Sequence, residues 1–169
     1  ADMLLDMGKA YYCYLSEDEL RIIREEKRKS NKNVNQNKWR DANKEDHPKD
    51  IKPVIRLKTP LSGYNVIDDI IQGTVRVENK QIDDMVLLRA DRTPTYNLAV
   101  SVDDYDMGIT HVVRGDDHLT NSFRQKLIYN ALGWKVPKFA HIPLIHDEFG
   151  KKLSKRKNAV SVDEYKNLG

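Results

Sequence analysis

The chain has 169 residues, and its 39% hydrophobic content is enough for one ordinary core, or for a small domain beside part of another. Its 29 lysine and arginine residues against 26 aspartate and glutamate residues leave a net charge of +3, too small to indicate nucleic-acid binding by itself. The single cysteine, Cys13, excludes an intrachain disulfide, and no run approaches the ~20 apolar residues of a membrane span. We therefore expect a cytoplasmic protein without membrane contact, in which Cys13 is a small buried apolar residue.

The first 50 residues are predicted to contain two helices, a short strand and a loop. An amphipathic pattern over residues 3–7 indicates a helix, and the tyrosine-rich residues 9–15 indicate a strand. Residues 16–19, Ser-Glu-Asp-Glu, form a capping box that should begin a charged helix. Residues 30–50 are rich in Asn, Lys and Asp, so we expect an exposed loop with Trp39 as its only large anchor.

Strand signals dominate the next 40 residues. Apolar and β-branched residues predict strands over residues 54–57, 65–71, 74–77 and 85–88, with a turn at Gln72-Gly73. We expect them to form one small mixed sheet with antiparallel pairing.

Helix and strand alternate after a turn at residues 91–94. We predict a helix over residues 96–103, a strand over 109–113, a helix over 116–132 and a strand over 139–145. The apolar face of the longer helix consists of Leu119, Phe123, Leu127, Ile128 and Leu132, and Gly133 should end it. This order is typical of a βαβ unit, whose ligands bind beyond the carboxyl ends of the parallel strands.

Two charged segments follow those strand ends. Residues 114–118 follow one strand, and five cations lie within residues 151–157 after the other. A lysine loop at the mouth of a parallel sheet suits a substrate whose charge grows during reaction, such as a phosphate chain that releases pyrophosphate. The same charge pattern is also typical of a solvated basic loop or of a nonspecific nucleic-acid patch.

The segment Lys152-Leu153-Ser154-Lys155-Arg156 resembles the KMSKS signature of class I aminoacyl-tRNA synthetases, in the spelling of the bacterial glutamyl branch. Further stretches resemble glutamyl-tRNA synthetases in the same order and spacing. These are residues 10–14, 81–89, 94–99, 102–104, 107–118 and 140–145.

The resemblance implies an α/β fold made of the second half of a class I Rossmann-like nucleotide-binding domain and a small α+β inserted domain. Residues 1–89 would be the inserted domain that binds the tRNA acceptor stem, and residues 90–169 the catalytic half that ends with the KMSKS-type loop. The implied enzyme is a glutamate-tRNA ligase that joins L-glutamate to tRNA(Glu) through a glutamyl-adenylate, with ATP and Mg²⁺. We expect a monomer.

The resemblance also implies roles for single residues. Lys155 would bind the ATP phosphates and stabilise the departing pyrophosphate, with Lys152, Leu153, Ser154 and Arg156 completing the loop. Asp117 and His118 would lie beside the adenine and ribose, and Leu144 and Ile145 would offer backbone groups to the adenine edge. Arg114 would pair with the glutamate side-chain carboxylate, which suits a fixed, always-charged guanidinium, and Tyr96 would line the amino-acid pocket.

Several of these residues also have an alternative explanation that is purely structural. Arg114 could pair with Asp116 or Asp117 on the surface, and Tyr96 could pack as a core ring. His118 could make a structural hydrogen bond at a helix start. His111 and His141 lie within apolar strands, so we expect both to be buried core histidines.

Some family features have no counterpart in this chain. With one cysteine and His47, it lacks the four ligands of a zinc site, so we expect no metal site. Val100 cannot make the polar contact that an asparagine makes at this position in some members.

Nothing matches the HIGH-like segment or the anticodon-reading region, and the chain begins and ends within predicted helices. We expect a piece of a longer protein with little or no aminoacylation activity alone. A glutaminyl enzyme, a paralogue that modifies a tRNA base, and a noncatalytic tRNA-binding module are the alternatives.

Overall fold

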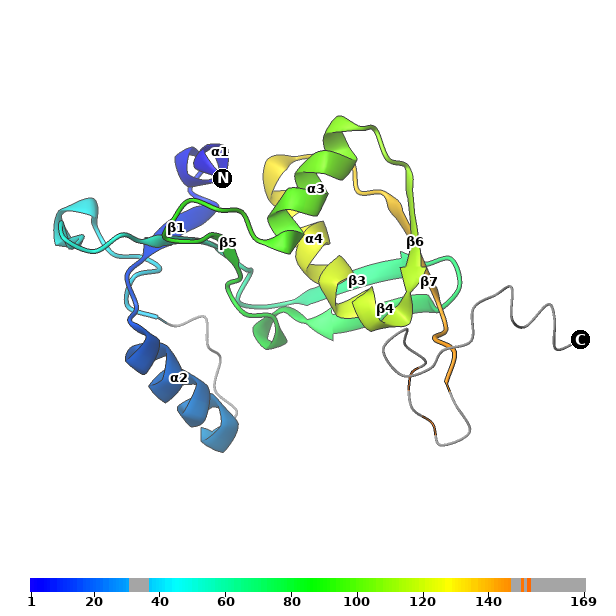
Figure 1. The fold of residues 1–169 in the computed structure, drawn as a ribbon, viewed down its shortest axis with the longest axis horizontal. Coiled ribbons are helices and arrows are strands. Elements are labelled where there is room, and N and C mark those ends of the chain that lie inside the picture. The colour runs from blue at the N-terminus through cyan, green and yellow to red at the C-terminus, as the bar shows by residue number, and fades with distance from the viewer. Residues whose placement is uncertain (31–36, 147–149, 151, 153–169) are drawn as a thin grey trace, which may run out of the picture.

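The computed structural model describes residues 1–30, 37–146, 150 and 152 (Figure 1). Apart from the segment between β2 and β5, the elements of the first half lie together as two α-helices, a 3-10 turn and a three-stranded sheet (Figure 1). They are α1 (Asp2–Asp6), β1 (Ala10–Cys13), α2 (Glu17–Ser30), the 3-10 helix η1 (Lys44–Asp46), β2 (Val54–Leu57) and β5 (Val86–Leu88).

The start of α2 confirms the predicted capping box. The Ser16 backbone N–H donates to Glu19 Oε2 at 2.8 Å, and the Glu19 N–H donates to Ser16 Oγ at 3.2 Å. These reciprocal bonds satisfy two N–H groups that the first helical turn leaves without intrahelical partners.

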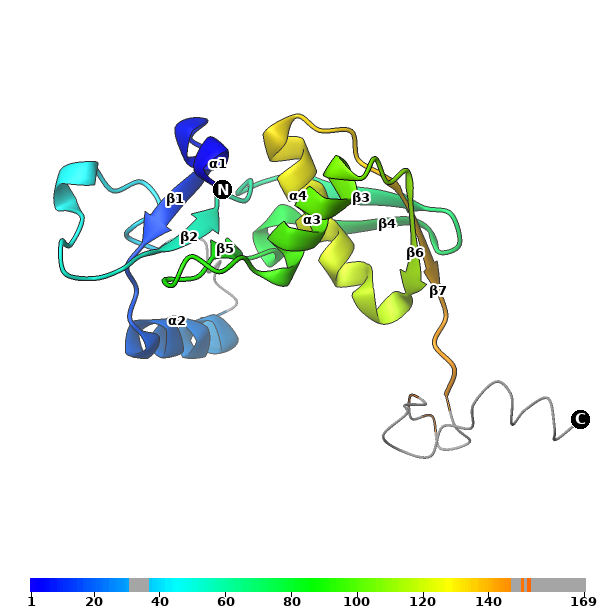
Figure 2. The ribbon, with the colours of Figure 1, turned by 45° about the horizontal axis from the view of Figure 1, so that its top comes forward.

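The prediction of one sheet in the first half is wrong, although its antiparallel pairing is confirmed. The strands β1, β2 and β5 form a three-stranded antiparallel sheet, while β3 (Tyr64–Asp69) and β4 (Gly73–Glu78) pair only with each other among the described strands. The hairpin β3–β4 packs instead against α4 and β7 of the second half (Figure 2). Alternation of apolar residues indicates which face of a strand is buried, but not what covers it.

Residues 37–50 form the predicted loop, with many exposed residues, but Arg40 adds a polar anchor that the sequence did not indicate. Arg40 forms a buried ion pair with Asp84 and donates to the Thr59 backbone oxygen at 2.7 Å. Tyr11 also donates its hydroxyl to Asp84, at 3.0 Å. Residues 31–36 lie outside the described part of the chain.

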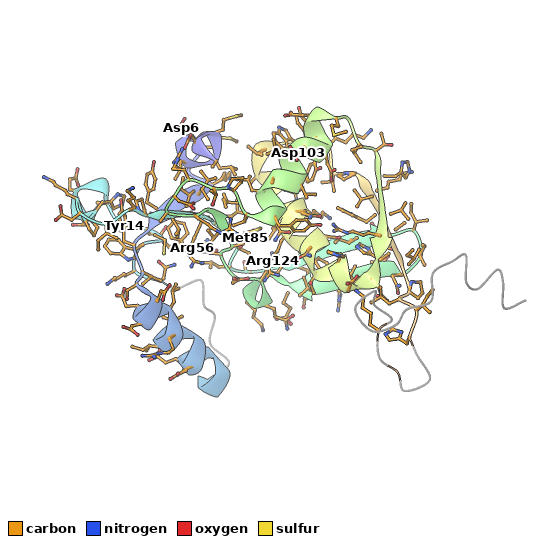
Figure 3. All side chains as sticks on the ribbon, in the orientation of Figure 1. Asp6, Tyr14, Arg56, Met85, Asp103 and Arg124 are labelled. Carbon is orange, nitrogen blue, oxygen red and sulfur yellow. The ribbon has the colours of Figure 1, made fainter. Side chains whose placement is uncertain are left out.

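Trp39 is a half-buried anchor, as predicted, and it belongs to an aromatic cluster. Its ring lies 5.0 Å from the Tyr14 ring and 6.3 Å from the His47 ring, and Tyr12 meets His47 edge-on at 5.9 Å. Tyr14 is labelled in Figure 3 at the side of the molecule that carries α2. His47 is therefore accounted for by ring packing.

The second half contains the predicted βαβ unit. The elements are α3 (Tyr96–Asp106), β6 (His111–Gly115), the 3-10 helix η3 (Asp116–His118), α4 (Leu119–Leu132) and β7 (Lys138–Ile142), preceded by η2 (Asn79–Gln81). The strands β6 and β7 are parallel, with Arg114 opposite His141. Gly133 follows α4 with a φ of 69°, the left-handed conformation expected of a residue that ends a helix.

Several predicted boundaries in this unit are wrong. The helix predicted over residues 96–103 continues to Asp106, and the strand predicted over residues 109–113 is His111–Gly115, so Arg114 lies within the strand. The long helix begins at Leu119 because Asp116–His118 form a 3-10 turn first. The strand β7 ends at Ile142, so Leu144 and Ile145 follow the strand instead of belonging to it.

One apolar core runs through both halves. The predicted face of α4 is confirmed, because Phe123, Leu127 and Ile128 are buried and Leu119 and Leu132 pack against them. Buried residues from the first half join the same cluster, among them Leu4, Ile55, Leu57, Ile67 and Leu87. Cys13 is 2% exposed, as expected. Among the described helices, none is long and apolar enough to cross a membrane.

Two adjacent aspartates test how strongly the Arg40 contact fixes residues 37–50. Asp84 is buried with its partner, whereas Asp83 pairs with Arg124 in a half-exposed ion pair. Asp84→Asn should lower the free energy of unfolding of the chain by about 3 kcal/mol, because it leaves the Arg40 charge buried without a counter-charge. Asp83→Asn should cost less than about 1 kcal/mol. Urea unfolding curves measure both, and equal effects would contradict the assignment.

Candidate active site

The predicted site residues of the βαβ unit converge at the carboxyl ends of β6 and β7. Arg114 and Gly115 are the last residues of β6, and Asp117 and His118 lie in the 3-10 turn that follows. The end of β7 lies alongside, with Ile142 opposite Gly115. The convergence arises because parallel strands present their carboxyl ends at the same edge of a sheet.

Arg114 is half-buried and held from the inside by neutral acceptors. Its Nη2 donates to Ser122 Oγ at 2.5 Å, to Gln125 Oε1 at 2.8 Å and to the His118 backbone oxygen at 3.4 Å. Its Nε donates to His141 Nε2 at 3.3 Å. Within the described part of the chain Arg114 makes no ion pair with Asp116 or Asp117, so the surface-pair explanation is wrong there.

The Nη1 group of Arg114 is the remaining part of the guanidinium. It has no hydrogen-bond partner among the described residues, whereas Nε and Nη2 are used by the protein. The face of the guanidinium is also supported, because Arg114 Cζ lies 5.8 Å from the centre of the Phe139 ring. Nη1 is therefore the part of the guanidinium that the described residues leave without a hydrogen bond.

His141 is fully buried, as predicted, and it lies between an aspartate and a serine. Its Nδ1 is 2.6 Å from Asp69 Oδ2, and its Nε2 is 3.0 Å from Ser122 Oγ. Burial alone would raise the pKa of the Asp69 carboxyl, but hydrogen bonds from the Gln72 and His141 backbone N–H groups and from the His141 ring lower that pKa to about 2.

The order of Ser122, His141 and Asp69 resembles that of a hydrolytic triad, but the surroundings differ. Ser122 is 0% exposed, and its hydroxyl oxygen already accepts a hydrogen bond from Arg114. A nucleophilic serine must reach its substrate. We therefore assign this group to the support of Arg114.

Tyr96 begins α3 and lies at the same edge. It is 49% exposed, so the explanation as a core ring is wrong. Its ring centre is 6.2 Å from that of His118, in a tilted arrangement. The half-buried His118 makes the structural hydrogen bond that we considered, between its Nδ1 and Asn121 Nδ2 at 3.1 Å.

A lysine that follows β7 reaches back to the turn after β6. Lys152 Nζ lies 2.5 Å from Asp117 Oδ2, and this hydrogen bond lowers the pKa of the Asp117 carboxyl. Leu144 lies close by, because a Cβ added to Gly115 would meet Leu144 at 2.9 Å and the Asp117 carboxylate at 2.7 Å. Ile145 is 73% exposed. Leu153, Ser154, Lys155 and Arg156 lie outside the described residues.

Sequence reasoning missed the residues that hold Arg114. Ser122 and Gln125 are polar residues on the buried face of α4, and Asp69 continues the buried face of β3 after Asn65 and Ile67. Polar residues at core-facing positions of an amphipathic pattern were the available signal. The prediction for His111 is wrong, because this residue is exposed at the start of β6.

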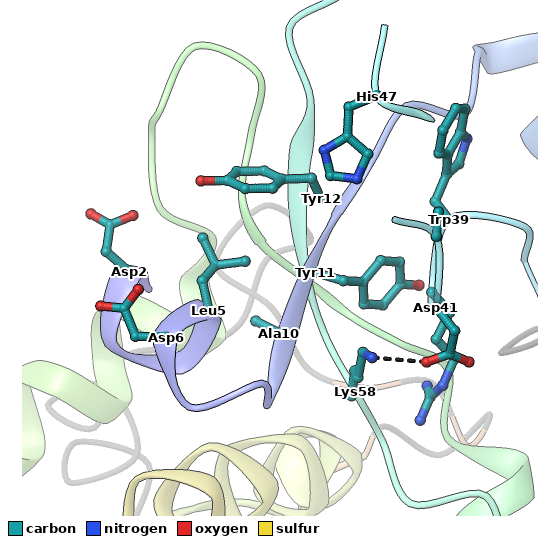
Figure 4. Close-up of a pocket in the computed structure, with 12 residues that line it drawn as sticks. Asp2, Leu5, Asp6, Ala10, Tyr11, Tyr12, Trp39, Asp41, His47 and Lys58 are labelled. Carbon is teal, nitrogen blue, oxygen red and sulfur yellow. Dashed lines mark hydrogen bonds and ion pairs between the residues drawn. The ribbon is translucent and has the colours of Figure 1, made fainter. Parts of the chain in front are cut away.

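A separate hollow of about 660 Å³ lies in the first half, between α1, β1 and residues 39–47 (Figure 4). Its walls include the rings of Tyr12 and His47 and the ion pair of Lys58 with Asp41 at 2.8 Å. None of the predicted site residues lines it. The described residues contain no group of three or more His, Cys, Asp or Glu side chains placed to hold a metal ion.

A comparison with protein families matches residues 1–169 to "tRNA synthetases class I (E and Q), catalytic domain". The chain is 58% identical to glutamate-tRNA ligase 2 of Paramagnetospirillum magneticum and 54% identical to glutamate-tRNA ligase 1 of Bartonella bacilliformis. Both alignments cover 100% of this chain and 36% of the relative. The chain thus spans little more than a third of the length of these curated relatives.

A solved structure shares the fold. The crystal structure of a glutamate tRNA ligase from Elizabethkingia meningosepticum, in complex with its amino acid, aligns with a TM-score of 0.76 and 35% identity. The alignment covers 92% of this chain and 34% of that one.

The contact between Lys152 and Asp117 can be tested by titration. Lys152→Met should raise the pKa of the Asp117 carboxyl towards its ordinary value of about 3.9, because the cation that favours the ionised form is removed. A ¹³C NMR titration of the carboxyl carbon measures this change. Lys138→Met, at the opposite end of β7, is the control and should not change the pKa of the Asp117 carboxyl. An unchanged pKa in Lys152→Met would contradict the contact.

Proposed function

Because the chain belongs to the class I tRNA synthetases for glutamate and glutamine, we propose that it carries the amino-acid site and part of the ATP site of a glutamate-tRNA ligase. The proposed reaction joins L-glutamate to tRNA(Glu) at the expense of ATP, through a glutamyl-adenylate. The glutamate branch is favoured over the glutamine branch by the names of the relatives above. We expect ATP to arrive with Mg²⁺ as part of the substrate.

The single observation that carries the proposal is the way Arg114 is held at the end of β6. Neutral groups bind its Nε and Nη2, and among the described residues no carboxylate contacts it directly and Nη1 has no hydrogen-bond partner, which supports a role in binding an acidic ligand. A guanidinium in this position suits the side-chain carboxylate of glutamate. Tyr96 would line the same pocket and offer its hydroxyl.

The ATP site would occupy the neighbouring strand end. Asp117 and His118 would lie beside the ribose and adenine, and the backbone of Leu144 and Ile145 would face the adenine edge. Lys152 is the described residue of the signature loop, and its contact with Asp117 at this edge supports the placement. We place Lys155 at the phosphates, with Leu153, Ser154 and Arg156 forming the rest of the loop.

The proposed chemistry requires no covalent enzyme nucleophile. The amino-acid carboxylate attacks the α-phosphate of ATP, and pyrophosphate leaves with the bonding electrons. A ribose hydroxyl at the end of the tRNA then attacks the carbonyl carbon of the adenylate; the ester bond forms, AMP leaves with the electrons of the broken C–O bond, and the hydroxyl proton passes to solvent. The protein contributes positioning, which avoids the entropy cost of a meeting in solution, and cations placed where negative charge grows.

The wider predictions remain part of this proposal. We place the acceptor-stem-binding domain at residues 1–89 and the catalytic half at residues 90–169, in a cytoplasmic monomer. The continuous apolar core would couple the two parts mechanically.

Lys155 tests the ATP half of the proposal. In the complete gene product, Lys155→Ala should lower the rate of adenylate formation by about 100-fold and change the KM for glutamate little, because its contact strengthens as pyrophosphate charge develops. Lys157→Ala, in the same loop but outside the signature, serves as the control. A rate equal to that of the control would remove Lys155 from the mechanism.

Arg114 tests the amino-acid half. Arg114→Ala should raise the KM for glutamate by about 10- to 100-fold, the effect of losing charge-assisted hydrogen bonds worth about 1.5–3 kcal/mol. The KM for ATP should change little. Arg76→Ala, which removes an exposed arginine that lies over the Tyr64 ring, is the matched control. An unaltered KM for glutamate in Arg114→Ala would refute the carboxylate role.

A further inference from the structure

We propose that Asp69 and His141 are positioning residues for Arg114, which fix the direction of its hydrogen bonds and thereby present Nη1 at the strand end. Asp69 lies at the end of β3 in the hairpin, 72 residues before His141 in the sequence. The part of this inference that concerns glutamate rests on the proposed function. The part that concerns the His141 tautomer does not.

The geometry determines which nitrogen of His141 carries the proton. Arg114 Nε can only donate, and it lies 3.3 Å from His141 Nε2, so Nε2 must be the acceptor. In a neutral imidazole the other nitrogen then carries the proton. His141 Nδ1–H therefore donates to Asp69 Oδ2 at 2.6 Å, which fixes this tautomer.

The hydrogen bonds of Ser122 run in the same direction, from Arg114 towards His141 Nε2. Its Oγ accepts from Arg114 Nη2 at 2.5 Å, and its own proton is free to point at His141 Nε2, 3.0 Å away. The donors Arg114 Nε–H and Ser122 Oγ–H therefore share the single lone pair of His141 Nε2. If Nε2 were protonated, it would face the N–H of Arg114, and two donors would oppose each other.

Asp69 is itself prevented from turning. Its Oδ1 accepts three backbone N–H groups, from Ile71 at 3.0 Å, Gln72 at 2.9 Å and His141 at 3.0 Å. The side chains of Asp69 and His141 are both 0% exposed, so solvent does not replace these contacts. Oδ2 of Asp69 is thus held towards the imidazole. The His141 ring therefore links the end of β3 to Arg114 through one hydrogen bond on each side.

Asp69→Asn should exchange the donor and acceptor roles of the two ring nitrogens of His141. The three backbone N–H groups require an oxygen at the Oδ1 position, so the new amide must place its N–H₂ group against His141 Nδ1. The imidazole must then accept at Nδ1 and carry its proton on Nε2, facing Arg114. An exchange of one oxygen for a nitrogen would therefore disturb an arginine that does not touch residue 69.

The tautomer is tested by NMR on the 169-residue chain, with long-range ¹H–¹⁵N correlation of the histidine rings at neutral pH. We expect His141 to be protonated at Nδ1 and not at Nε2 in the unchanged chain, and the reverse in Asp69→Asn. Asp68→Asn, on the exposed face of the same strand, should keep the original tautomer. A doubly protonated or Nε2-protonated ring in the unchanged chain, or the same tautomer in Asp69→Asn, would overturn the inference.

Kinetics of the complete gene product test the consequence for the site. Asp69→Asn should raise the KM for glutamate about 10- to 100-fold without a matching change in the KM for ATP, because a small misplacement of Nη1 weakens one contact only. Ser122→Ala removes one hydroxyl and should act in the same direction while the chain stays folded. Asp68→Asn should have no effect on either KM.

The outcomes separate this inference from the proposed function. If Arg114→Ala raises the KM for glutamate but Asp69→Asn and Ser122→Ala do not, the positioning role is wrong and the glutamate site stands. If Arg114→Ala leaves the KM unchanged, the glutamate site is wrong, and the NMR result alone decides the tautomer.

Discussion

The site depends on how the half-buried guanidinium of Arg114 finds hydrogen-bond acceptors for its N–H groups without being neutralised by a carboxylate of the protein. A carboxylate in direct contact would satisfy Arg114 well, but it would compete with any acidic ligand. The protein uses the neutral oxygens of Ser122 and Gln125 and the neutral nitrogen of His141 instead. The nearest carboxylate in this network, Asp69, is held behind the imidazole ring. Among the described residues, Arg114 is therefore held through Nε and Nη2 by neutral groups, and Nη1 is left without a hydrogen-bond partner.

The sequence predicted the elements around this site better than their partners. Periodicity located α4, β6 and β7, and the capping box located the start of α2, because these signals lie within a few residues of one another. The place of the β3–β4 hairpin was not predictable in this way. It depends on contacts such as that of the Asn65 side chain with the Phe123 backbone, 58 residues apart.

The residues of the site also differ in whether local sequence was enough to identify them. Arg114, Asp117 and His118 could be named because they lie within one short segment at the end of a predicted strand. Asp69 could not, because a strand-end aspartate next to another aspartate is an ordinary turn feature, and its meaning comes from His141. The loop around Lys155 shows the opposite case, since five consecutive residues, 152–156, carry the whole signature. The signature loop is therefore identified by its sequence, whereas Asp69 is identified by its contact with His141 in the structure.

The central claim is that Arg114 recognises a negative charge at this strand end. The direct measurement is calorimetric titration of the complete gene product with glutamate and with glutamine, which differ at the side chain only by the exchange of a carboxylate for an amide. We predict that glutamate binds at least about tenfold more tightly, because the amide cannot form a charge-assisted pair with Nη1. Equal affinity for the two amino acids would contradict the account.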